Sequence, residues 1–170
     1  MPELQLMRHA KSDWHTHVDD LERPLNERGR ADAVKMAHAL KAVSRVPDCV
    51  LVSPAQRTQE TLERLLSQWQ GQAPRIVTDK TLYLAAAEVL LEMAALYIDS
   101  HARLMVLAHN PGMDIAVSQI SRQPPPLTRA GKLMVTAAVA CFALEQAADL
   151  QKSGKCDLIQ LLRPSDLAQG

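Results

Sequence analysis

Three short apolar runs in this sequence each lead directly into polar residues. The runs cover residues 4–7, 49–52 and 104–107. Arg8 and His9 follow the first run, Ser53 follows the second, and His109 follows the third after one alanine. Apolar runs of about four to eight residues between polar loops are typical of buried strands. The sequence therefore predicts a sheet whose strands deliver polar side chains at their C-terminal ends.

Segments with helical periodicity separate these strands. Asn26 is a residue type that caps helices, and apolar residues recur after it at helical spacing. These are Ala33, Met36, Ala37, Leu40 and Val43. A second helix is expected with Ser53 as its N-cap, Pro54 at its first position and Arg57 in its first turn. It should end near residue 67.

The remaining segments continue this alternation. Further strands are expected over residues 75–77, 135–144 and 158–162, and further helices over 88–98 and 113–121. Residues 147–155 are expected to connect the last two strands. The helix over 88–98 is expected to turn inward Val89, Leu90, Met93 and either Leu96 or Tyr97. The three prolines from Pro124 mark a loop.

Strands that alternate with helices predict an α/β domain with a largely parallel sheet. A chain of 170 residues forms one compact domain by default, here residues 1–170. In such sheets, ligands bind beyond the carboxyl ends of the strands. Arg8, His9, Arg57 and His109 all fall at such ends, so we expect them to share one site.

Charge and cysteine content narrow the class of partner. The chain has 19 basic and 19 acidic side chains, so its net charge predicts binding neither to nucleic acid nor to membrane lipids. No apolar stretch approaches the roughly 20 residues of a membrane span. Three widely separated cysteines in apolar surroundings predict buried free thiols. We therefore expect a cytoplasmic protein.

Two arginines and two histidines at one site suit phosphoryl transfer. That reaction spreads negative charge over three equatorial oxygens, which a site stabilises with fixed cations and hydrogen-bond donors. A guanidinium matches paired phosphate oxygens and stays charged at any working pH. A neutral imidazole nitrogen is a competent nucleophile near pH 7.

Four ordered motifs carry a resemblance to a known family. They read LMRHAKS from residue 6, RPLNERG from residue 23, SPAQRTQET from residue 53 and HNPG from residue 109. The sequence resembles the histidine phosphatase superfamily, which is phosphoglycerate mutase-like, and more closely its small SixA-type branch of phosphohistidine phosphatases. The similarity extends to TAA at residues 136–138 and LRPSDL at 162–167.

This resemblance implies both a fold and a set of roles. The fold is a three-layer α/β/α sandwich with a mostly parallel central sheet and no lid domain, and the chemistry needs no metal or other cofactor. By the resemblance, His9 is the nucleophile, Arg8 and Arg57 bind the phosphate, and His109 is the second histidine of the phosphate pocket.

Neighbouring residues provide further candidates. Lys11, Ser12 and Trp14 follow the nucleophile and are expected at the mouth of the pocket, Lys11 and Ser12 as substrate-binding residues. A general acid is less evident, because Leu84 stands where many relatives carry Glu. Glu88 is the nearest candidate for that role.

The predicted function is removal of phosphate from a histidine on a partner protein, either a phosphotransfer domain or a phosphocarrier, through a phospho-His9 intermediate. A phosphorus–nitrogen bond needs less help from an acid than a phosphomonoester does. Residues 81–103 also leave no room for a lid over the pocket. Two alternatives remain: a phosphatase for small phosphomonoesters with Glu88 as its acid, and a module that binds phosphoproteins without cleaving them.

Overall fold

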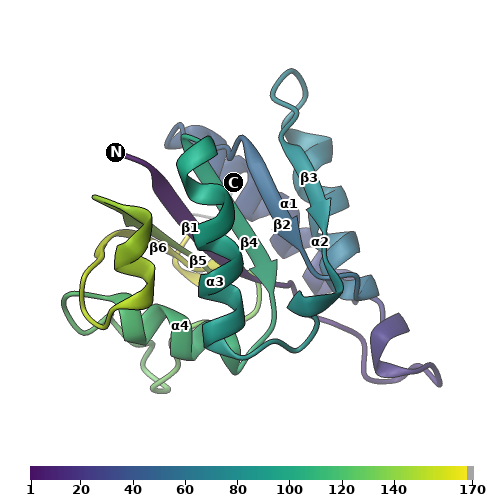
Figure 1. Cartoon of the computed structure of the whole chain (residues 1–170). Coiled ribbons are helices and arrows are strands. Elements are labelled where there is room, and N and C mark those ends of the chain that lie inside the picture. Colours follow the sequence, from purple (N-terminus) through teal and green to yellow (C-terminus); the bar gives the residue numbers. More distant parts are fainter. Residues whose placement is uncertain (168–170) are drawn as a thin grey trace.

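The computed structural model describes residues 1–167, which fold around a six-stranded sheet (Figure 1). The strands are β1 (Glu3–Arg8), β2 (Cys49–Val52), β3 (Arg75–Thr78), β4 (Arg103–Ala108), β5 (Val139–Ala143) and β6 (Asp157–Leu162). Their order is β3-β2-β4-β1-β5-β6. The pairs from β3 to β1 are parallel, and β5 runs antiparallel to both β1 and β6. The predicted mostly parallel sheet is confirmed.

Helices cover both faces of this sheet. They are α1 (Glu27–Ala42), α2 (Gln56–Gln68), α3 (Ala87–Tyr97) and α4 (Gly112–Ile120). Short 3-10 helices cover Asp20–Glu22, Lys80–Leu82, Ile98–Ser100, Ala147–Gln151 and Pro164–Asp166. Figure 1 shows α3 and α4 in front of the sheet, with α1 and α2 behind it. The predicted three-layer sandwich is therefore confirmed, and no lid domain is present within residues 1–167.

Side chains along the central strands alternate between two apolar cores. In β2, Val50 and Val52 pack in the core under α1 and α2, whereas Cys49 and Leu51 pack in the core under α3 and α4. A parallel sheet that is covered on both faces needs apolar side chains at every position. This explains why its strands appear in the sequence as uninterrupted apolar runs.

Two glycines let helices pack against the loops that carry the site. At Gly29, in the first turn of α1, a Cβ atom would overlap the carbonyl oxygen of Lys11. At Gly112, at the start of α4, a Cβ atom would overlap the carbonyl oxygen of Ala85. Only glycine allows backbones to approach this closely. The two helices thereby fix the segment after β1 and the segment before α3.

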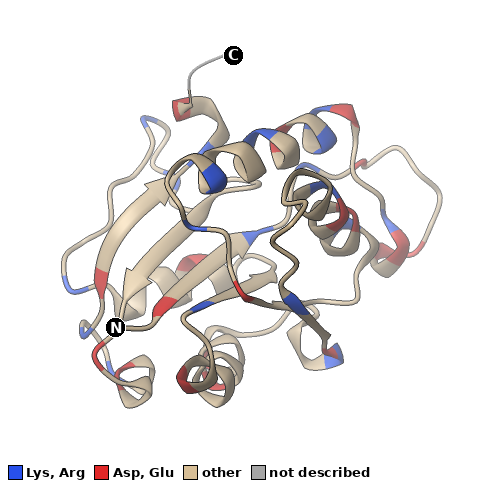
Figure 2. Ribbon diagram, turned by 90° about the horizontal axis from the view of Figure 1, so that it is seen from above, with Lys and Arg blue, Asp and Glu red and all other residues tan. Residues whose placement is uncertain are grey.

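The structure also shows the state of the cysteines, the character of the helices and the distribution of charged residues. All three cysteines, Cys49, Cys141 and Cys156, are buried and free, as the sequence predicts. No helix within residues 1–167 combines the length and apolarity needed to cross a lipid bilayer. Acidic and basic residues are both spread over the helices and loops (Figure 2).

The second helix begins later than the sequence predicts. α2 starts at Gln56 with Ala55 as its N-cap, so Ser53 does not cap it. Instead, the Ser53 hydroxyl oxygen accepts a hydrogen bond from the Ala55 N–H at 3.3 Å. Serine followed by proline favours a turn as well as a helix start, and here the chain turns first.

The prediction for the strand over 135–144 was wrong at its beginning. β5 starts only at Val139. Ala137 has a φ of 66°, a left-handed conformation that is incompatible with a strand. The predicted run therefore contains a turn followed by a shorter strand.

The predicted inward face of α3 is mostly confirmed. Leu90 is buried, and Val89, Met93 and Tyr97 are partly buried against the same core, whereas Leu96, the alternative to Tyr97, is 75% exposed. Leu91 and Ala94, which were not predicted, are also buried. This helix carries apolar residues around most of its circumference, so periodicity alone did not identify the whole of the packed face.

Candidate functional site

Polar side chains that follow β1, β2 and β4 converge on one cavity of about 270 Å³. The residues that line it are Arg8, His9, Lys11, Ser12, Trp14, Asp20, Arg23, Arg57, Leu84, His109, Asn110 and Thr136. They include every residue predicted at the site except Glu88. Glu88 is exposed in the first turn of α3, and the structure does not bring it to the cavity.

His9 is held as a neutral imidazole with a defined tautomer. Its Nδ1 lies 2.7 Å from the carbonyl oxygen of Ala10, and because a carbonyl only accepts, Nδ1 carries the proton. Nε2 therefore keeps its lone pair. The side chain is 6% exposed, and burial lowers its pKa to about 3. His9 is thus uncharged and nucleophilic at neutral pH.

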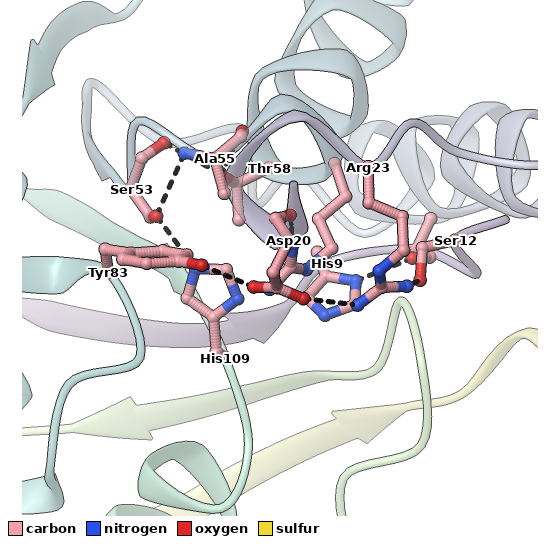
Figure 3. A network of polar contacts seen from close by, with 11 residues as sticks. His9, Ser12, Asp20, Arg23, Ser53, Ala55, Thr58, Tyr83 and His109 are labelled. Atoms are coloured by element: carbon pink, nitrogen blue, oxygen red, sulfur yellow. Dashed lines mark hydrogen bonds and ion pairs between the residues drawn. The ribbon is translucent and has the colours of Figure 1, made fainter. Parts of the chain in front are cut away.

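His109 is fixed through Ser53. Its Nε2 lies 2.8 Å from the Ser53 hydroxyl oxygen, which also accepts the Ala55 N–H (Figure 3). Within residues 1–167, Nε2 is the acceptor available to the Ser53 hydroxyl proton, so Nδ1 carries the imidazole proton. Burial lowers the pKa of His109 to about 4. The two histidine rings lie with their centroids 5.3 Å apart.

The two predicted phosphate-binding arginines are each held from one end. Arg8 Nη1 donates to the carbonyl oxygen of Met134 at 3.1 Å. Arg57, which is 2% exposed, donates from Nη1 to the backbone oxygen of Asp20 at 2.7 Å and from Nη2 to the Asp20 carboxylate at 3.0 Å. These contacts leave the Nε edge of both guanidinium groups unused.

Asp20 links several groups of the site. Figure 3 shows its carboxylate between Tyr83 and Arg23. The Tyr83 hydroxyl donates to Oδ2, and Arg23 Nη2 lies 3.3 Å from Oδ1. The hydrogen bond from Tyr83, followed by that from Arg57, lowers the pKa of Asp20 to about 2. Asp20 is therefore ionised at neutral pH, and it is the only carboxylate among the lining residues of the described chain.

The SPAQRTQET motif supports the loop after the nucleophile. Thr61 Oγ1 accepts the Ala10 N–H at 3.0 Å and donates to the carbonyl oxygen of Arg57 at 2.7 Å. Glu60 Oε2 accepts the Leu25 N–H at 2.6 Å. One helix, α2, thus supplies Arg57 to the cavity and also fixes both ends of the loop that carries Asp20.

Besides Nε of Arg23, three buried polar atoms of the site have no hydrogen-bond partner within residues 1–167. They are Nε of Arg8, Nε of Arg57 and Nδ1 of His109. Buried N–H groups are almost always paired in native proteins. These three come from separate segments that meet at His9. The arrangement suits a tetrahedral oxyanion, whose oxygens would accept from all three donors.

Sequence reasoning assigned no site role to Asp20, Arg23, Tyr83 or Ser53. Arg23 and Ser53 do lie inside the RPLNERG and SPAQRTQET motifs, so their membership of these motifs could have indicated a role at the site. Asp20 and Tyr83 are joined only because two loops meet in space. The local sequence around either residue does not reveal that contact.

Comparison with known proteins relates part of this sequence to one family. The model of the histidine phosphatase superfamily (branch 1) matches residues 4–83. An uncharacterized chloroplast protein of Arabidopsis thaliana is 32% identical over 127 residues, which make up 69% of this chain and 58% of that protein. An uncharacterized protein of Mycobacterium tuberculosis is 33% identical over 105 residues, 62% of this chain and 63% of that protein. The chain spans less than two thirds of the length of these curated relatives.

Solved structures share the fold over nearly the whole chain. A candidate phosphohistidine phosphatase SixA from Agrobacterium tumefaciens is 25% identical with a TM-score of 0.78, over 96% of this chain and 99% of that one. The protein histidine phosphatase SixA complexed with tungstate is 23% identical with a TM-score of 0.78, over 98% and 99%. The family match contains Arg8, His9 and Arg57, and the shared fold extends to His109. Residues 4–83 are therefore similar to the histidine phosphatase superfamily, branch 1, and the chain shares the fold of the SixA structures.

Proposed function

We propose that this protein is a phosphohistidine phosphatase that takes a phosphoryl group from a histidine of a partner protein onto His9. The observation that carries the proposal is a neutral His9 in a cavity of arginine and imidazole donors. Among the described residues that line this cavity, the only carboxylate is Asp20, which is ionised. Such a cavity contains a nucleophile and cations for the phosphoryl group. The part of the chain from residue 1 to residue 167 supplies this cavity with no carboxylic acid that could protonate a leaving group.

In the first step, the lone pair of His9 Nε2 attacks phosphorus as the bond to the substrate nitrogen breaks. The electron pair of that bond stays on the leaving imidazole, which takes a proton from solvent. Arg8, Arg57 and His109 hold the three phosphoryl oxygens through the transfer. The Nδ1–H of His9 remains bonded to the Ala10 carbonyl oxygen, which stabilises the positive charge that develops on the ring.

In the second step, water attacks the phosphorus of phospho-His9. The bond from Nε2 to phosphorus breaks, its electron pair returns to Nε2, and inorganic phosphate leaves with the oxygen of the water. The same three donors hold the oxygens again. The enzyme therefore returns to its starting protonation state without a cofactor entering the reaction.

The leaving group distinguishes this proposal from a phosphomonoesterase. An alkoxide needs a positioned acid, which contributes about 10²–10⁴ in rate, whereas an imidazole leaves with much less assistance. Asp20 is an anion at neutral pH, and Glu88 lies outside the cavity. The tungstate complex of the SixA structure supports oxyanion binding in this fold.

The test is phosphate release from a phosphohistidine-bearing protein, measured beside release from an aryl phosphate. Wild type should act on the protein, and His9→Ala should abolish that release. His38→Ala removes an exposed histidine from α1 and should leave it intact. Preference for the aryl ester would favour the small-molecule phosphatase. Phosphate-sensitive binding without release from either substrate would favour the binding module.

A further inference from the structure

An exposed aromatic ring stands at the mouth of the cavity, and the phosphoryl chemistry does not use it. Trp14 lines the cavity and is 69% exposed. Only 3% of the chain is aromatic, and the other tryptophan, Trp69, is 1% exposed with its Nε1 bonded to the Ala37 carbonyl oxygen at 3.1 Å. Trp69 is a core residue, whereas Trp14 contributes little to the core. Indole rings at such positions commonly contact ligands.

Arg23 holds this indole in place. The guanidinium carbon of Arg23 lies 3.6 Å from the ring centroid of Trp14. Arg23 is 8% exposed and donates to the Ser12 hydroxyl and to the Asp20 carboxylate. Because the guanidinium covers one face of the ring and the residue is still largely exposed, the other face is available to a second planar group.

Leu84 adds an apolar contact from another loop. It lines the cavity, is 55% exposed and follows Tyr83, whose ring contacts His109 edge-on with centroids 5.5 Å apart. Its φ is 51°, which is uncommon for leucine and is typical of positions that the surroundings fix for function. The mouth of a cationic phosphate site thus presents an aromatic and an aliphatic side chain.

We propose that Trp14 is a stacking platform for a planar aromatic leaving group, and that it makes the site select aryl and imidazolyl phosphates over alkyl phosphates. This inference rests on the proposed phosphatase function. A leaving imidazole one bond away from phosphorus would lie at the cavity mouth while the phosphoryl oxygens contact the arginines. Stacked aromatic pairs of ordinary strength give a preference of about three- to tenfold.

Binding of inert analogues tests the platform independently of turnover. Phenylphosphonate and methylphosphonate both carry the oxyanion, and only the first carries a ring. In wild type, phenylphosphonate should bind more tightly and quench indole emission. Trp14→Ala should lose about three- to tenfold in affinity for phenylphosphonate and little for methylphosphonate, whereas Trp14→Phe should keep most of the preference.

Kinetics provide the second arm of the test. Trp14→Ala should raise the KM for free phosphohistidine and for an aryl phosphate about three- to tenfold with little change in kcat. Leu127→Ala removes a comparably exposed leucine from a loop that does not line the cavity, and it should change none of these values.

Three results would overturn the platform. They are equal losses for phenyl- and methylphosphonate, no loss for either, or a Trp14→Ala defect that appears with a phosphoprotein and not with small aromatic phosphates. The last result would make Trp14 a contact for the surface of the partner. If wild type released no phosphate but showed the ring preference, the proposed function would fail while the platform stood.

Discussion

Asp20 binds the guanidinium of Arg57 twice, through its carboxylate at 3.0 Å and through its own backbone oxygen at 2.7 Å. The buried cation that is expected to bind the phosphoryl group is thus itself held by an anion from a loop. Charge-assisted contacts of this kind restrict a guanidinium to one orientation. The same carboxylate also places a negative charge beside a site that is expected to bind a phosphoryl dianion, and this charge opposes binding. Asp20 therefore fixes the orientation of Arg57 but lowers the affinity of the site for phosphate.

Substitution Asp20→Asn separates these two effects. The backbone contact remains, but the charge is lost. We expect inorganic phosphate to inhibit about three- to tenfold more strongly because a like charge leaves the cavity. We expect kcat to fall by about tenfold because Arg57 is less well oriented. Asp19→Asn is the matched control, since the Asp19 side chain makes no cap hydrogen bond. Identical inhibition and turnover constants in both variants would refute the role given to Asp20.

Ser53→Ala should disturb the tautomer of His109. Without the hydroxyl proton at Nε2, the ring is free to carry its proton on either nitrogen and loses the fixed Nδ1–H donor. We expect kcat/KM to fall about 10- to 100-fold, and nitrogen NMR shifts of His109 to report a mixture of tautomers. Ser121→Ala is a control, because it removes a buried hydroxyl that bonds only within α4. An unchanged tautomer in Ser53→Ala would show that the hydroxyl does not set it.

The two site histidines should make the fold less stable in mild acid. Their folded-state pKa values of about 3 and about 4 lie below the ordinary value of 6.5. The unfolded chain therefore binds more protons between those values, and stability falls as pH drops through 6.5 toward 4. From pH 7 to pH 5, each histidine should cost on the order of 2 kcal/mol in free energy of unfolding.

Denaturant unfolding of wild type and His9→Ala at both pH values measures this effect. The variant should lose less stability than wild type over the same interval. His38→Ala should behave like wild type, since His38 is exposed. Equal pH dependence in wild type and His9→Ala would mean that His9 titrates normally in the folded protein.

Gly29→Ala should destabilise the protein although alanine favours helices. A Cβ at this position would overlap the Lys11 carbonyl oxygen, so α1 or the loop after β1 must shift. We expect a loss of about 1–3 kcal/mol in free energy of unfolding, together with reduced kcat because His9 is next to that loop. Arg28→Ala, in the same turn and exposed, should be near neutral. A gain in stability from Gly29→Ala would show that the close approach is absent in solution.

The sequence predicted the site residues that lie at the C-terminal ends of strands. Arg8, His9 and His109 follow apolar runs, and parallel strands bring such positions to one edge of a sheet. It could not predict Asp20, because nothing local states where the loop from Lys11 to Pro24 folds back. That position depends on long-range contacts, such as those of Thr61 and Glu60 with the two ends of the loop.

Glu88 is a residue that the sequence suggested for the site but that lies outside the cavity. It lies close in sequence to Tyr83 and Leu84, which reach the site, but α3 begins in between and turns it outward. Its position close to these residues in the sequence was therefore not a sufficient reason to expect Glu88 as the general acid. The packed face of α3 was predicted only in part, because a helix that is apolar nearly all round does not encode every residue that meets the core, and Leu91 and Ala94 were missed.

His9 is the residue that we propose receives the phosphoryl group. The most direct test of this proposal is to mix the enzyme with a radiolabelled phosphohistidine protein, quench within the first turnover, and locate the label by mass spectrometry. We expect an acid-labile phosphoryl group on His9 that is absent in His9→Ala and disappears as phosphate is released. Full turnover by His9→Ala, or label trapped on any other residue, would contradict the proposal.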